Sequence, residues 1–196
     1  SELIATQLAE WFPDSRFLHL IRDPRDNFAA ISAGSDSHSR EIGESRQASL
    51  SSLLHRLNWS MRIASSNVRL LGSDRYSCIR FEDLVADVAS TMHDVADFVD
   101  IEFTSTLLVP TIWSRSTPGN NYDGTNFEGV SVHNRGRWAE RITELEVGAI
   151  EFLLGDVMET FGYSRTITDD LAVHAAIKMY QWSNYAHHYY DSFDHN

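Results

Sequence analysis

The chain is short of cysteine, of basic residues and of long apolar runs, and each shortage excludes a class of protein. Cys78 is the only cysteine among 196 residues, so no disulfide bond can form within the chain. A protein without disulfides suits a reducing compartment, and we expect a cytoplasmic location. No apolar run approaches the ~20 residues that a membrane-spanning helix needs, so we do not expect the chain to span a membrane.

The charge balance is strongly acidic, with 16 lysine and arginine residues against 28 aspartate and glutamate residues and a net charge of −12. This balance argues against nucleic acid as a partner. Any anionic ligand must therefore be held by a local basic cluster that works against the overall field. The sequence contains two such clusters, which are Arg22 with Arg25, and Arg135 with Arg137 and Arg141.

Hydrophobic residues make up 42% of the chain and charged residues 22%, which is ordinary for one globular domain. Apolar spacing predicts a helix over Leu3–Phe12, which Pro13 stops. The nearly continuous apolar run Phe17–Ile21 predicts a strand that is buried on both faces, as in a parallel sheet. His19 within this strand is interpreted as a hydrogen-bonded core residue.

Further elements follow from periodicity and turn signals. The polar stretch Ser37–Ser45 is predicted to be a loop. From Leu50 onward, apolar residues recur every three or four positions and predict a long helix that Gly72 ends. Tyr76–Phe81 predicts a second strand, and Asp87 is the expected N-cap of the helix after it.

The last third of the chain predicts a loop and two helices. Pro110–Val132 is rich in Gly, Asn, Ser and Thr and reads as a long loop. Thr143-x-x-Glu146 is a capping box ahead of a helix that Gly162 closes. A final helix runs from about Asp170, with an apolar and aromatic stripe that reaches Phe193.

These elements predict an α/β fold in one domain over residues 1–165. Residues 166–196 are predicted to form an aromatic-rich helix that packs on this domain or on a partner subunit, as in a homodimer. Two parallel strands do not make a stable sheet by themselves. Either strands are hidden in the loop region, or the native protein has an N-terminal portion that precedes Ser1. We favour the second explanation.

The segment Arg22-Asp23-Pro24-Arg25-Asp26 follows the first strand directly. Asp23 suits an N-cap, Pro24 the first helical position and Asp26 the first turn. A helix that begins at the carboxyl end of a parallel strand is a common phosphate site, because its N–H groups point at the anion. Alternatively, the two arginines simply neutralise the two aspartates at the surface, with Arg25 facing Asp26 or solvent.

The neighbouring sequence resembles the bacterial-type sulfotransferase family that uses 3′-phosphoadenosine 5′-phosphosulfate (PAPS), and specifically its C-terminal two-thirds. Phe12–Asp26 is similar to the family's 3′-phosphate-binding stretch, and Arg80–Leu84 to its Arg-Tyr-Glu-Asp-Leu segment. Gly119–Val130 resembles the glycine- and asparagine-rich loop before the last motif. Arg135–Trp138 resembles the closing cofactor segment. The resemblance implies a P-loop-kinase-like three-layer sandwich with a central parallel sheet.

The resemblance also implies which residues bind PAPS and its product, 3′,5′-adenosine bisphosphate (PAP). It makes Arg22 a ligand of the 3′-phosphate and places Phe81 by the adenine. The family's serine eight positions after the arginine is Ala30 here, and Ser32 is the candidate substitute. The remaining candidates for cofactor binding are Arg135, Gly136 and Arg137.

The resemblance implies transfer of a sulfuryl group from PAPS to a hydroxyl or amine, the acceptor being a small molecule, a sugar or a peptide. Nothing in Ser1–Asp14 matches the family's phosphosulfate loop or its catalytic base, so we expect both upstream and the chain alone to be incomplete as an enzyme. A small-molecule kinase of the same architecture and a non-catalytic interaction module are the alternatives. No metal is expected, because adjacent histidines such as His187 and His188 point to different sides of a helix.

Overall fold

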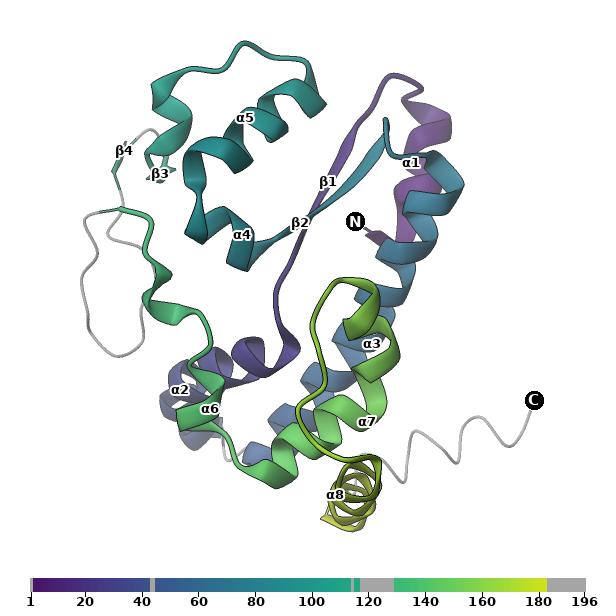
Figure 1. The fold of residues 1–196 in the computed structure, drawn as a ribbon, viewed down its shortest axis with the longest axis vertical. Coiled ribbons are helices and arrows are strands. Elements are labelled where there is room, and N and C mark those ends of the chain that lie inside the picture. The colour runs from purple at the N-terminus through teal and green to yellow at the C-terminus, as the bar shows by residue number, and fades with distance from the viewer. Residues whose placement is uncertain (1, 43–44, 114, 117–128, 183–196) are drawn as a thin grey trace. The chain divides into compact units, whose positions relative to one another are not determined.

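The computed structural model describes residues 2–42, 45–113, 115–116 and 129–182 (Figure 1). The chain divides into two compact units, each made of two separate stretches of sequence. The first unit comprises Ser1–Arg22 and Arg62–Arg135, and the second comprises Asp23–Met61 and Gly136–Asn196.

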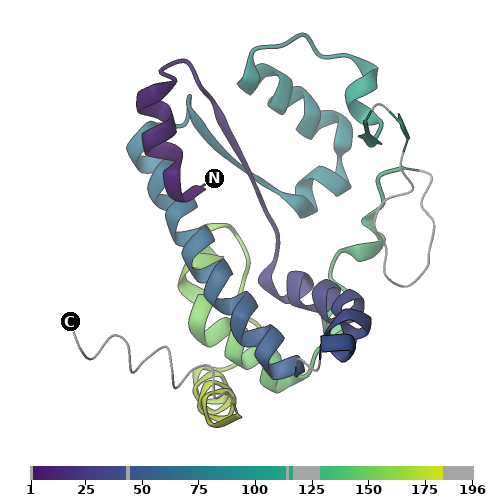
Figure 2. The same ribbon diagram turned by 180° about the vertical axis from the view of Figure 1, so that it is seen from behind.

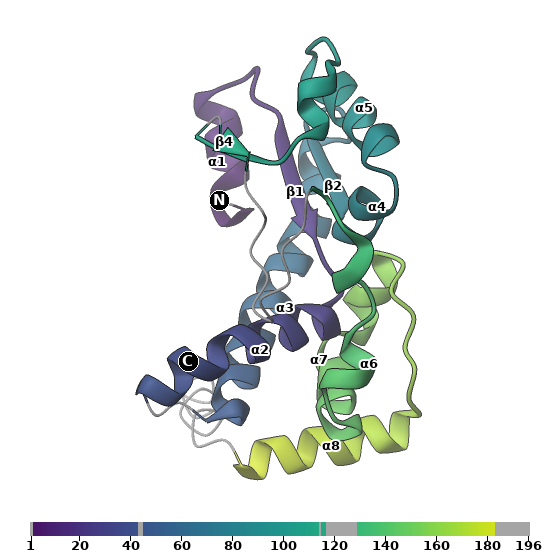
Figure 3. The same cartoon turned by 90° about the vertical axis from the view of Figure 1, so that its left-hand side faces the viewer.

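The first unit contains a parallel strand pair with helices on either side. In chain order its elements are η1 (Glu2–Ile4), α1 (Ala5–Trp11), β1 (Phe17–Ile21), the end of α3 (Arg46–Leu71), β2 (Tyr76–Arg80), α4 (Phe81–Ala86), α5 (Val88–Val99), η2 (Ser105–Leu108), β3 (Thr111–Ile112), β4 (Arg115–Ser116) and η3 (Val132–Asn134). Figures 1 and 3 show α1 on one side of the strand pair and α5 on the other.

The second unit is helical in the part of the chain that the structure describes. Its elements are α2 (Pro24–Ile42), the first part of α3, α6 (Trp138–Arg141), α7 (Glu144–Thr160) and α8 (Asp169–Trp182). Figures 2 and 3 show α8, drawn in yellow-green, lying across α7. The core of the second unit consists mainly of apolar side chains of α3 and α7 together with Phe28 of α2.

The strands β1 and β2 pair in parallel, with a register from Phe17 opposite Tyr76 to Ile21 opposite Arg80. The predicted strand and its parallel pairing are therefore confirmed. The expected burial on both faces is wrong, because Leu18 is 45% exposed and Leu20 is 53% exposed. Among the described residues β1 pairs only with β2, and its side chains alternate between a covered and an open face.

The predicted helix boundaries are largely confirmed. Gly72 and Gly162 have φ values of +84° and +77°, the left-handed conformation in which glycine ends a helix. Asp87 caps α5 by accepting a hydrogen bond from the Ser90 N–H at 2.9 Å. At the start of α7, Thr143 and Glu146 form the predicted capping box.

Three predicted boundaries are wrong. The helix α2 continues to Ile42, although Ser37–Ser45 was expected to be a loop. Residues 35–42 contain neither proline nor glycine, so their polarity alone did not break the helix. Phe81 begins α4 rather than ending the second strand. The expected loop over Pro110–Val132 contains the short antiparallel pair of β3 and β4, while residues 117–128 lie outside the described residues.

The close packing of α7 and α8 depends on Gly148. A Cβ atom at this position would lie 2.5 Å from the Ala175 Cβ and 3.3 Å from the Leu171 carbonyl oxygen. The division of the chain at residue 165 stays a prediction, and the aromatic stripe beyond Trp182 lies outside the described residues. No helix in the described part of the chain has both the length and the apolar character to cross a membrane.

Candidate anion site around the first turn of α2

The first turn of α2 has the local structure that the sequence predicts. Pro24 takes the first helical position, and the Asp23 carbonyl accepts a hydrogen bond from the Asn27 N–H at 2.8 Å. The Asp23 Oδ1 accepts a second bond from the backbone N–H of Arg25 at 2.9 Å. Asp23 thus caps the helix with its own side chain.

Arg25 is buried, with 4% of its surface exposed, and this contradicts the expectation that it faces Asp26 or solvent. Its Nε and Nη2 donate to the two carboxylate oxygens of Asp23 at 2.9 and 2.7 Å. Its Nη1 donates to Glu151 Oε1 of α7 at 2.7 Å and to the Ser164 carbonyl at 3.0 Å. The guanidinium also lies 4.5 Å from the centre of the Trp138 ring.

One buried cation, Arg25, serves two buried carboxylates in this cluster. Glu151 is 1% exposed and accepts further hydrogen bonds from the Thr166 N–H, the Thr166 hydroxyl and the Ile167 N–H. Burial by itself lowers the pKa of Arg25, but the hydrogen bonds and charges of Asp23 and Glu151 outweigh it and raise that pKa. Arg25 is therefore a structural cation that joins α2 to α7 and to the chain after α7.

Asp26 holds the segment that contains two of the predicted cofactor residues. Its Oδ2 accepts a hydrogen bond from the Gly136 N–H at 2.6 Å, and its Oδ1 accepts one from the Trp138 N–H at 3.0 Å. Asp26 is 2% exposed. Gly136 has a φ of +71°, and Arg137 after it has an ordinary right-handed conformation with φ −74° and ψ −9°.

Arg22 and Phe81, which the resemblance assigns to the 3′-phosphate and the adenine, lie together in the first unit. The Arg22 guanidinium carbon is 4.6 Å from the centre of the Phe81 ring. Ile21 and Arg80 are opposite each other in the parallel register. The residues that follow them, Arg22 and Phe81, therefore both lie at the carboxyl end of the strand pair. The parallel pairing of β1 and β2 is what brings these two residues together.

The other candidates divide between the units. Arg135 is exposed and follows η3 in the first unit, where η3 contacts α4, the helix that Phe81 begins. Ser32, Gly136 and Arg137 belong to the second unit. The Ser32 Oγ is buried and has no hydrogen-bond partner among the described residues.

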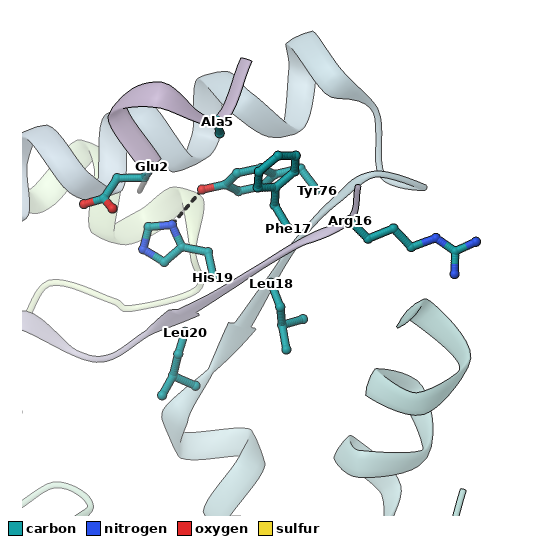
Figure 4. Close-up of a pocket in the computed structure, with 8 residues that line it drawn as sticks. All are labelled: Glu2, Ala5, Arg16, Phe17, Leu18, His19, Leu20 and Tyr76. Carbon is teal, nitrogen blue, oxygen red and sulfur yellow. Dashed lines mark hydrogen bonds between the residues drawn. The ribbon is translucent and has the colours of Figure 1, made fainter. Parts of the chain in front are cut away.

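A pocket of about 400 Å³ lies beside β1 in the first unit (Figure 4). His19 and Tyr76 point into it from the two strands, and the His19 Nδ1 lies 2.8 Å from the Tyr76 hydroxyl. This contact confirms His19 as a hydrogen-bonded residue, and burial is the main cause that lowers its pKa. The described residues contain no cluster of histidine, cysteine and carboxylate side chains that could hold a metal ion, and His187 and His188 lie outside them.

Comparison with curated protein sequences gives no match. Among solved structures, the chain is similar to the sulfotransferase domain from the curacin biosynthetic pathway, with a TM-score of 0.61 and 16% sequence identity. The match covers 85% of this chain and 60% of that one, and at this identity it shows the fold alone. A sequence model of the sulfotransferase family matches residues 4–105, which include β1, Arg22 and Phe81. Since this match spans more than half of the 196 residues, the chain belongs to the sulfotransferase family.

Proposed function

We propose that this protein is a PAPS-dependent sulfotransferase that acts on a hydroxyl or amine group of a small molecule, sugar or peptide. The observation that carries the proposal is the Arg22 guanidinium at the carboxyl end of β1, stacked on the Phe81 ring. This position suits an anionic ligand with an aromatic base, because the arginine can meet a phosphate while the ring offers a flat apolar contact. PAPS and PAP both have this chemistry.

The described residues fit such a ligand. Arg135 is exposed on the segment that contacts α4, so a second cation is available near the helix that carries Phe81. When bound, PAPS supplies an activated sulfuryl group. The residues named here bind and orient the nucleotide end, so their contribution is positioning and charge compensation.

We further propose that the parallel pair belongs to a larger, P-loop-kinase-like sheet in the complete protein. The open face and single partner of β1 among the described residues support this idea. The only lysine of the chain is Lys178 on α8. The phosphosulfate contacts are therefore proposed to come from outside these 196 residues. The catalytic base is proposed to lie there too, because Ser1–Asp14 does not resemble the family's segment that carries it. With a single cysteine in the chain, the proposed cellular location is the cytoplasm.

Thermal unfolding of the full natural chain with PAP and with adenosine 5′-monophosphate (AMP) tests the proposal. A ligand that binds only the native state raises its stability, so PAP should raise the melting temperature more than AMP does at equal concentration. Because the two nucleotides differ only in the 3′-phosphate, the difference reports on that group alone. Equal shifts would remove the case for a 3′-phosphate site and favour the small-molecule kinase.

A further inference from the structure

The side chains of Arg22 and Phe81 meet at the carboxyl end of the strand pair. Arg22 is the first residue after β1, and Phe81 is the first residue of α4, which follows β2 directly. Both belong to the first unit and both are partly buried. The Arg22 guanidinium carbon lies 4.6 Å from the centre of the Phe81 ring, within the ~6 Å range of a cation–π contact. One face of the ring is therefore covered by the arginine.

The Phe81 ring stands on an anchored backbone. The helix α4 continues from β2 without a break and contacts α5, and its residues Glu82 and Val85 are buried. Arginine is among the side chains that lose the most entropy when they become ordered. A ring on a fixed backbone can therefore act as a support that keeps the longer Arg22 side chain in one direction.

An aromatic face is a suitable support for an arginine that binds an anion. The ring attracts the guanidinium through its quadrupole and leaves the positive charge in place. A carboxylate would hold the guanidinium as well, but it would neutralise the charge and compete with phosphate. The contact with Phe81 thus gives Arg22 a direction without using its charge.

We propose that Phe81 is a positioning residue that holds the Arg22 guanidinium in the direction in which it meets the 3′-phosphate of PAPS and PAP. This inference rests on the proposed function, because it assigns a role within the same site. It also limits how the ring can contact the adenine, since Arg22 leaves only the opposite face and the edge of the ring. Arg22 is then ordered before the nucleotide binds, which reduces the entropy lost on binding.

The alternative is that Phe81 is only a contact for the adenine or only contributes to stability. PAP and AMP differ only in the 3′-phosphate, so either of these roles would change both affinities by the same factor. A positioning role changes the ratio of the two affinities, because only PAP carries the phosphate that Arg22 would meet. It also predicts that the effect of Phe81 on this ratio disappears when Arg22 is absent.

The experiment measures dissociation constants of PAP and AMP by calorimetry for the full natural chain and its variants at one salt concentration. Phe81→Leu removes the ring but keeps an apolar side chain. We expect it to lower the preference for PAP over AMP by about fivefold, the size of one partly exposed cation–π contact. Phe81→Tyr keeps the ring and should keep the preference. In an Arg22→Ala background, Phe81→Leu should leave the preference unchanged. Phe152→Leu, which changes a half-exposed phenylalanine of α7, is the matched control.

Nuclear magnetic resonance of the wild type covers the case in which Phe81→Leu does not fold. Protons that lie over an aromatic ring resonate at higher field because of the ring current. The side-chain protons of Arg22, identified by their absence in Arg22→Ala, should show this shift in the ligand-free protein. They should keep it when PAP is added, because a supporting ring stays in contact with the arginine in the bound state.

The ratio of the two affinities decides whether Phe81 positions Arg22. An unchanged ratio in Phe81→Leu would overturn the inference while leaving the proposed function intact. A full effect of Phe81→Leu in the Arg22→Ala background, or loss of the ring-current shift when PAP is added, would also overturn it, because Phe81 would then not act through Arg22. A wild-type protein that binds PAP no better than AMP would instead refute the proposed function itself.

Discussion

At the scale of single residues, Arg22 and Arg25 show how far a short motif can be interpreted. Both flank the same turn, and the sequence predicted that turn correctly. It did not predict that Arg25 is buried, because its partner Glu151 lies 126 residues further along the chain. Arg22 lies beside Phe81 because the two residues follow β1 and β2, which pair in parallel. Their assignment to a cofactor site came from the family resemblance and stays a prediction.

Arg22→Ala should weaken PAP binding by roughly 1.5–3 kcal/mol, the range for hydrogen bonds to charged groups. The melting temperature should change little, because the arginine is only partly buried at the end of its strand. Isothermal calorimetry at one fixed salt concentration measures the loss, with Arg69→Ala on the exposed face of α3 as the control. Matching affinities for wild type and Arg22→Ala would remove Arg22 from the cofactor site.

Arg25→Ala should lower the free energy of unfolding by about 3–5 kcal/mol, because it leaves two buried carboxylates without their cation. Urea denaturation measures this change. The control is Arg165→Ala, whose ion pairs with Glu159 and Asp169 are exposed and should contribute less than about 1 kcal/mol. Similar losses in the two variants would mean that the buried cluster carries no more stability than a surface ion pair.

At the scale of elements, periodicity and caps predicted the helices well, and contacts between distant elements explain the differences. The capping box at Thr143 and the N-cap at Asp87 are local signals and were both correct. The exposure of Leu18 and Leu20 depends on what covers the open face of β1, which an apolar run does not encode. The length of α2 was missed because its polar second half lacks an apolar stripe.

Gly148→Ala should destabilise the second unit although alanine favours helices more than glycine does. The gain in helix propensity is about 1 kcal/mol, while overpacking in a filled interface costs about 1–3 kcal/mol. The added Cβ would meet the Ala175 Cβ and a backbone carbonyl, neither of which can rotate away. Thermal unfolding compares it with Gly129→Ala, where a Cβ has open space and no loss is expected. A Gly148→Ala protein with a higher melting temperature than wild type would show that α8 can move away from α7 without a loss of stability.

At the scale of the whole molecule, the fold is supported by comparison with known proteins, whereas the contacts around the first turn of α2 are known only from the structure. The family match and the similar sulfotransferase domain agree on the fold. The sequence predicted that fold from four motifs in order, which no single motif would have supported. The positions of Arg25 and Asp26 required the structure, because they depend on contacts with α7 and with Gly136–Trp138.

Global stability should fall in alkali, in part because of Cys78 on β2. Burial raises the pKa of this thiol from its ordinary value of 9.0 to about 11. The unfolded chain therefore loses the proton first, so the contribution is complete below pH 9 and is lost as the pH rises through about 11. Urea denaturation across this range should show a steeper loss for wild type than for Cys78→Ala. Parallel curves would show that the thiol titrates alike in both states.

Because each unit is made of two separate stretches of sequence, the two units are completed at different times during synthesis. The chain passes from one unit to the other after Arg22, after Met61 and after Arg135. On the ribosome, the last residue of the first unit is therefore made while α7 is still missing. Arg25 can pair with Asp23 at once, but it must wait for Glu151, made 126 residues later, for its second carboxylate partner. The ionic cluster thus closes only late in translation, and a nascent chain that stops before α7 leaves the α2 turn without its partner.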